Sequence, residues 1–156
     1  MKSMPMTFAA IALLALVSTA FADRQTPDPV IGTWKLNVAQ SSGTVPKSDT
    51  RTYATVAGGT KVTYTRQGAD GQESTAQATY KPDGKDYPAT GAPNYDTVSA
   101  RRIDRHTTEV TLKSGGKIVG ITTRTVSKDG KTLTLVTKPS ADPGASPTST
   151  LVFDRQ

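Results

Sequence analysis

Five turns that contain glycine divide most of this chain into short runs, and they constrain its fold more than any other feature. These turns are Gly58-Gly59, Asp70-Gly71, Asp83-Gly84, Gly115-Gly116 and Asp129-Gly130. Two-residue hairpin turns need positive φ angles, which glycine adopts freely and aspartate tolerates. Because such gaps are too short for a parallel crossover, the sequence predicts a series of consecutive antiparallel hairpins.

The runs between these turns alternate apolar and polar residues, as half-buried strands do. The predicted strands are Val30–Val38, Asp49–Val56, Lys61–Gln67, Glu73–Tyr80, Lys85–Ala89, Tyr95–Ile103, Thr107–Lys113, Lys117–Ser127, Lys131–Lys138 and Ser149–Arg155. Pro88 weakens the fifth of them, so we expect about eight to ten strands. No stretch has helical periodicity, and the prolines of Pro139–Pro147 indicate a loop.

An antiparallel sheet of this size exposes two edges unless it closes on itself. A closed up-and-down barrel removes both edges. We therefore predict an all-β fold with one barrel domain at residues 30–156, and we expect it to be a monomer.

The first 22 residues have the features of a secretory signal peptide. Lys2 supplies a positive charge, residues 8–17 form an uncharged run too short to span a bilayer, and Ala20-Phe21-Ala22 is a small-x-small cleavage site. An uncleaved anchor or a buried helix is the alternative. We expect cleavage after Ala22, export to the periplasm or the cell exterior, and an N-terminal arm at residues 23–29. The chain has no cysteine, which excludes disulfides and a lipid on cysteine, and no later segment predicts a transmembrane helix.

Two short sequences at the ends of the predicted barrel resemble the lipocalin and calycin pattern. Gly32-Thr33-Trp34 opens the first strand and Arg155 closes the last. Over nearly its whole mature length, the chain is similar to bacterial secreted lipocalin-like proteins, through residues 32–37, 83–88, 102–104, 127–132 and 154–156. The resemblance implies a barrel whose final arginine packs over the tryptophan, and it implies no established biochemical activity. This chain has neither the disulfides nor the room for the C-terminal helix that lipocalins often carry, which argues against a large apolar cavity.

Strand order gives the same pair a physical basis. In a closed barrel with an even number of strands, the first and last strands are neighbours, which brings Arg155 within reach of Trp34. A guanidinium group over an indole face stabilises by about 0.5–2 kcal/mol. We therefore expect Trp34 and Arg155 to close one end of the barrel; a frayed terminal arginine is the alternative.

The sequence contains no set of residues typical of catalysis. His106 is the only histidine and there is no cysteine, so neither a zinc site nor a nucleophile–base pair is predicted. Asp70, Asp83 and Asp129 each precede a glycine and are interpreted as turn formers. We expect no enzyme activity, no metal and no cofactor. The net charge of +6 is spread along the chain without interleaved aromatic residues, which argues against nucleic-acid binding.

A ligand site is the better hypothesis. Tyr64 and Arg66 share one face of Lys61–Gln67, and Arg124 lies on one face of Lys117–Ser127. If these faces point inward, Arg66 or Arg124 with Tyr64 could bind an anion such as a carboxylate. Apolar residues occur on both faces of the second run, so an outward arginine is the alternative.

Tyr80, Tyr87 and Tyr95 surround the segment 83–93. They could line a barrel mouth and stack on a ligand, or they could cap a small core. We interpret Tyr87 as a candidate ligand residue.

Two functions are compatible with the sequence. The first is an exported, non-enzymatic lipocalin-like module for a small apolar or anionic amphipathic molecule. The second is a filled barrel with a structural or protein-interaction role. An internal cavity of a few hundred Å³ favours the first function, and its absence favours the second.

Overall fold

The computed structural model describes residues 27–139 and 144–156, which consist mainly of β-strands. The strands are β1 (Gly32–Leu36), β2 (Ser42–Gly43), β3 (Ser48–Val56), β4 (Gly59–Gln67), β5 (Glu73–Tyr80), β6 (Asp83–Thr90), β7 (Thr97–Arg102), β8 (Thr107–Ser114), β9 (Lys117–Val126), β10 (Thr132–Lys138) and β11 (Ser149–Arg155). Each of the predicted runs overlaps one of these strands. The predicted signal peptide, residues 23–26 of the arm and residues 140–143 lie outside the described residues. Within the described part of the chain, no helix has the length and apolar character needed to cross a bilayer.

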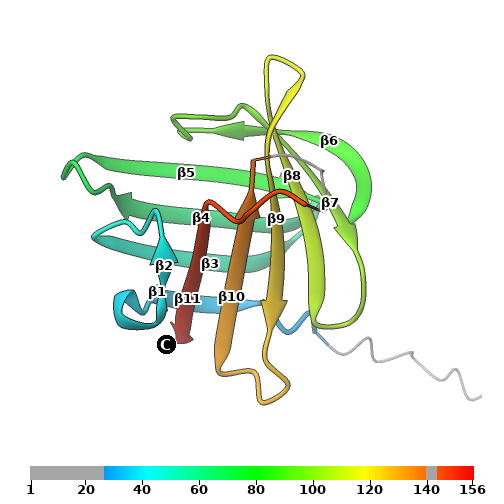
Figure 1. Cartoon of the computed structure of the whole chain (residues 1–156). Helices are drawn as coiled ribbons and strands as arrows, with labels where there is room; N and C mark the ends of the chain where they lie inside the picture. The colour runs from blue at the N-terminus through cyan, green and yellow to red at the C-terminus, as the bar shows by residue number, and fades with distance from the viewer. Residues whose placement is uncertain (1–26, 140–143) are drawn as a thin grey trace, which may run out of the picture.

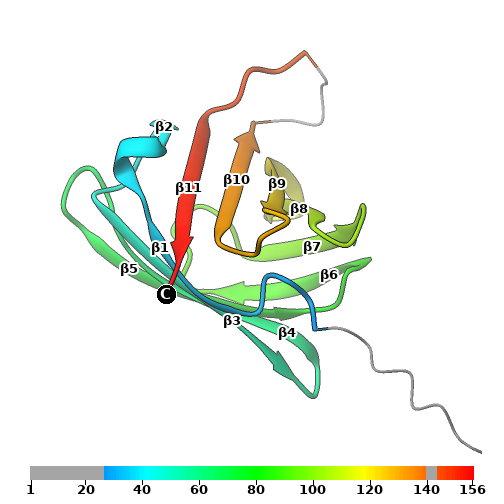
Figure 2. The same ribbon diagram turned by 90° about the horizontal axis from the view of Figure 1, so that it is seen from below.

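The strands form a closed antiparallel barrel (Figure 1). From β3 to β11 every strand pairs with the next, and β1 pairs with both β3 and β11. The wall therefore consists of β1 and β3–β11, which confirms the predicted up-and-down barrel. Figures 1 and 2 show β3–β5 running across the direction of β9–β11, with the C-terminus beside β1.

The first predicted strand is shorter than expected. It ends at Leu36 because Asn37 caps a single 3-10 turn, η1 (Val38–Gln40): its Oδ1 accepts from the Gln40 backbone N–H at 3.2 Å. After this turn, β2 pairs with the first residues of β11. One side of β11 is thus covered by β1 at one end of the barrel and by β2 at the other.

The predicted Asp83-Gly84 turn between β5 and β6 also differs from the prediction, as a comparison with a regular two-residue turn shows. The Gly115-Gly116 turn joins β8 to β9 with φ angles of +55° and +79°, as a two-residue hairpin requires. Asp83-Gly84, in contrast, lies inside β6, where the ladder with β7 shifts register between Asp83 and Asp86. The ladder with β5 joins only two residue pairs, the last of them beside Pro88, which cannot donate a backbone hydrogen bond.

Trp34 and Arg155 meet at one end of the barrel, which we call the closed end. They are register partners in the β1–β11 ladder, and the Arg155 Cζ lies 4.2 Å from the centroid of the Trp34 ring. Trp34 is fully buried, and its Nε1 donates to the Val30 carbonyl oxygen at 2.8 Å. An apolar cluster surrounds the pair: Val30, Leu36, Tyr53, Val126, Leu133, Leu135, Leu151 and Phe153.

Backbone carbonyl groups fix the Arg155 side chain in this position. It donates to the carbonyl oxygens of Gly130 at 2.5 Å, Ile31 at 2.8 Å and Pro29 at 2.6 Å. Asp28 forms an ion pair with Arg102 on β7. The described residues of the predicted N-terminal arm therefore cover the closed end.

Gly32 shows why a glycine precedes Trp34 by two residues. Its φ angle is +138°, and a Cβ at this position would lie 2.5 Å from the Arg155 Nη1. We predict that Gly32→Ala lowers the free energy of unfolding by about 1–3 kcal/mol in urea denaturation, because it combines backbone strain with a steric clash.

Gly120→Ala is the matched control, because a Cβ there meets its nearest atoms at an ordinary 3.6 Å. In an Arg155→Ala background the steric part of the Gly32→Ala effect should disappear. Equal losses for Gly32→Ala and Gly120→Ala would contradict this account.

Candidate ligand cavity inside the barrel

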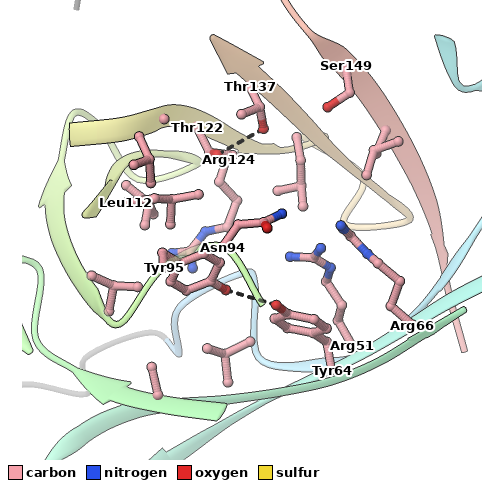
Figure 3. Close-up of a pocket in the computed structure, with 18 of the residues that line it drawn as sticks. Arg51, Tyr64, Arg66, Asn94, Tyr95, Leu112, Thr122, Arg124, Thr137 and Ser149 are labelled. Atoms are coloured by element: carbon pink, nitrogen blue, oxygen red, sulfur yellow. Dashed lines mark hydrogen bonds between the residues drawn. The ribbon is translucent and has the colours of Figure 1, made fainter. Parts of the chain in front are cut away.

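A cavity of about 370 Å³ lies inside the barrel and adjoins the apolar cluster of the closed end, because Tyr53, Leu135 and Leu151 belong to both. Its walls come from β3–β5 on one side and β8–β11 on the other, and the β6–β7 loop contributes Asn94 and Tyr95 (Figure 3). Side chains such as Val62, Leu112 and Leu135 give these walls an apolar character. The volume lies within the range of small-molecule sites.

Strand alternation places charged groups on the inner wall. On β3, Asp49 and Arg51 point inward while the threonines beside them point outward. The β3–β4 register pairs Asp49 with Arg66 and Arg51 with Tyr64. Direct cross-strand partners share one face of a sheet, so these four side chains form one inward-facing group.

Asp49 is the buried hydrogen-bond acceptor that holds this group together. Its side chain has no exposed surface. Arg51 donates to it through Nε at 3.0 Å and Nη2 at 2.8 Å, which is bidentate pairing. Arg66 donates through Nε at 2.9 Å to Oδ2 of the same carboxylate. One negative charge therefore holds two guanidinium groups in fixed positions.

Two aromatic rings pack against the Arg51 guanidinium. Its Cζ lies 4.8 Å from the centroid of the Tyr64 ring and 5.2 Å from that of Phe153. Burial by itself would lower the pKa of Arg51, but the Asp49 carboxylate, together with Tyr53 and Tyr95, outweighs burial and leaves this pKa above its usual value. Arg51 is therefore a permanent positive charge facing the cavity.

A phenol pair lies beside Arg51. The hydroxyl groups of Tyr64 and Tyr95 are 3.1 Å apart, which joins the β6–β7 loop to β4 (Figure 3). Burial raises the pKa of Tyr95, so its hydroxyl stays protonated at neutral pH. One of these hydroxyl groups donates to the other, which leaves the second able to donate a hydrogen bond to a polar ligand group near Arg51.

Arg124 on β9 faces the cavity from the opposite wall and is 4% exposed. It donates to the Tyr80 hydroxyl at 2.5 Å and to the Thr108 hydroxyl at 3.1 Å. Its Cζ lies 5.1 Å from the centroid of the Tyr53 ring. Among the described residues, no carboxylate forms an ion pair with it.

The structure brings three of the four candidate ligand residues together. Tyr64, Arg66 and Arg124 all line the cavity, so both arginines point inward. Tyr87 is not among the described lining residues, which differs from its expected position. It lies on β6 beside the register shift, and its hydroxyl donates to the Asp83 Oδ2 at 2.8 Å.

Sequence reasoning missed Asp49 and Arg51. The signal was present, because both residues alternate with the threonines of the predicted strand Asp49–Val56. What was missing was the register with Lys61–Gln67, which sets Asp49 beside Arg66.

His106 lies outside the cavity in the turn between β7 and β8, where its backbone N–H donates to the Asp104 Oδ1 at 2.7 Å. Its Nδ1 is buried without a hydrogen-bond partner. In residues 27–139 and 144–156, no group of three or more His, Cys, Asp or Glu side chains could hold a metal ion.

In comparisons with known proteins, no protein-family model matches this chain and no curated protein matches it.

The Asp49 network predicts a stability effect. We expect Asp49→Asn to lower the free energy of unfolding by about 3–5 kcal/mol, because it leaves two guanidinium groups without their buried counter-charge. Urea denaturation at fixed ionic strength measures the loss.

Glu109→Gln is the matched control. It removes the carboxylate from the ion pair with Arg101, whose side chain is 66% exposed, and should cost less than about 1 kcal/mol. Similar losses for both variants would show that Asp49 does not have this role.

Proposed function

We propose that this chain is a lipocalin-like, non-enzymatic binding protein that holds a small amphipathic anion inside its barrel. The observation that carries the proposal is the chemistry of the cavity. Its described lining includes Arg51, Arg66 and Arg124 but no acidic side chain. A cavity with apolar walls and an excess of positive charge favours a ligand with an apolar body and an anionic group.

The geometry supports one orientation for such a ligand. A carboxylate would accept hydrogen bonds from the guanidinium groups of Arg51 and Arg66, which Asp49 already holds in place. The apolar body would then contact the walls formed by residues such as Val110 and Leu112. Because these groups are already ordered, binding would cost little conformational entropy.

The alternative function, a filled barrel with a structural or protein-interaction role, receives less support. A filled barrel would not contain a cavity of about 370 Å³ with several arginines on its wall. Buried guanidinium groups are costly unless a counter-charge is supplied.

Calorimetric titration with decanoate tests the proposal. We expect binding with a Kd below about 100 μM, which corresponds to about 5.5 kcal/mol. Arg66→Gln should weaken this binding by about tenfold or more, because it removes one guanidinium partner of the carboxylate. The Arg51–Asp49 pair stays intact in this variant, so the fold should be retained.

Lys128→Gln is the matched control, since it removes an equal charge from an exposed turn between β9 and β10. It should leave decanoate binding unchanged. No decanoate binding at millimolar concentration would refute the proposal and favour the filled barrel.

We also propose that the protein is exported, on the basis of the signal-like residues 1–22. Expressed with its full sequence in a bacterial host, the protein should be recovered from the periplasm or medium with Asp23 as its first residue. Ala22→Lys should block cleavage at this site, because small residues are required there. Recovery of uncleaved protein from the cytoplasm would contradict export.

A further inference from the structure

The cavity holds more positive charge than its own side chains neutralise. Arg51 and Arg66 share the single carboxylate of Asp49, which leaves one positive charge. Arg124 adds a second, because no described carboxylate forms an ion pair with it. Asp28 acts on Arg124 through space and also forms an ion pair with Arg102, so its one carboxylate serves two guanidinium groups and still leaves one positive charge uncompensated.

Tyr80, which accepts a hydrogen bond from Arg124, does not supply the missing negative charge. Burial raises the pKa of Tyr80, and the opposing effect of Arg124 does not reverse this shift. The Tyr80 phenol is therefore neutral at physiological pH and serves Arg124 only as a hydrogen-bond acceptor. Thr108, its other partner, carries no charge.

The two positive charges lie at different depths. Arg51 stacks on Tyr64, its register partner on β4, whereas Arg124 stacks on Tyr53, two residues further along β3. Two residues along a strand span about 7 Å. Arg124 is also near Tyr80, which is the last residue of β5. Ser74 lies at the other end of this strand. Arg51 and Arg66, whose side chains are 13% and 33% exposed, thus form an outer cationic pole. Arg124, which is 4% exposed, forms an inner one and lies on the opposite wall (Figure 3).

We propose that the ligand is a compact dianion with an apolar body and two acidic groups, one at each pole. This inference rests on the proposed function and specifies its ligand class. The outer acidic group binds Arg51 and Arg66. The inner group accepts from N–H groups of Arg124 that its hydrogen bonds to Tyr80 and Thr108 leave free, and each group compensates one buried positive charge.

Matched aromatic probes separate this ligand class from simple anions. Naphthalene-2,6-dicarboxylate carries two charges at opposite ends, 2-naphthoate has the same body with one charge, and 2-naphthyl phosphate carries both charges on one group. All are fully ionised at pH 8, which lies above the second phosphate pKa of about 6. Titrations at equal ionic strength keep the screening constant.

We expect the dicarboxylate to bind about tenfold or more tightly than 2-naphthoate, because it adds one charge-assisted contact. It should also bind more tightly than 2-naphthyl phosphate, whose charges reach only one pole. Arg124→Gln should reduce dicarboxylate affinity to that of 2-naphthoate and leave 2-naphthoate affinity within about twofold. Arg124→Lys should retain the preference, and Lys128→Gln should change nothing.

The other outcomes distinguish failure of the dianion inference from failure of the proposed function. If 2-naphthoate and the dicarboxylate bind equally, the dianion inference fails while the proposed anion-binding function stands. Tighter binding of 2-naphthyl phosphate than of the dicarboxylate would overturn the assignment of two separate poles. If no probe binds and decanoate also fails, the proposed function fails as well. The wild-type comparison decides the inference even where Arg124→Gln does not fold.

Discussion

The Arg155 side chain connects the parts of the chain that close this barrel. Its guanidinium lies over Trp34 on the first strand and donates to carbonyl oxygens of the N-terminal segment and of the β9–β10 turn. These contacts join the last strand to the first and fix the end of the barrel that would otherwise fray. Hydrogen bonds from a charged donor are stronger than neutral ones, so this end is well defined. Gly32 belongs to the same arrangement. Only glycine adopts its positive φ without strain and leaves room for the guanidinium.

Closure at this end determines where the core and the cavity lie. The large apolar side chains, including Phe153 and Leu133, gather around Trp34 and fill the closed end. Few large apolar residues remain for the rest of the interior, whose buried members include Ala78, Ala100 and Gly120. Small side chains leave space that the barrel wall cannot collapse to fill, because each strand is held by ladders on both sides. A cavity is the result.

The polar groups of this cavity are arranged at some cost to stability. A buried charge needs a partner, and in the part of the chain that the structure describes, Arg51 and Arg66 share one carboxylate, that of Asp49. Arg124 has hydroxyl partners and an aromatic face but no ion pair among the described residues. Structural needs alone do not explain this imbalance, since apolar residues of similar volume would pack without the cost of desolvation. The anion binding that we propose would explain it.

The sequence determined the elements, and the tertiary structure decided the site. Turn residues and alternation are local, so they were sufficient to predict every strand of the wall and, through strand order, the meeting of Trp34 with Arg155. Local signals failed where the chain left the regular strand pattern, as at the Asn37 cap of η1 and at the register shift between Asp83 and Asp86. Alternation shows which residues share a face, but only closure decides which face is the inside. For that reason the direction of Arg124, the partnership of Asp49 with two arginines and the separate position of Tyr87 became known only from the folded barrel.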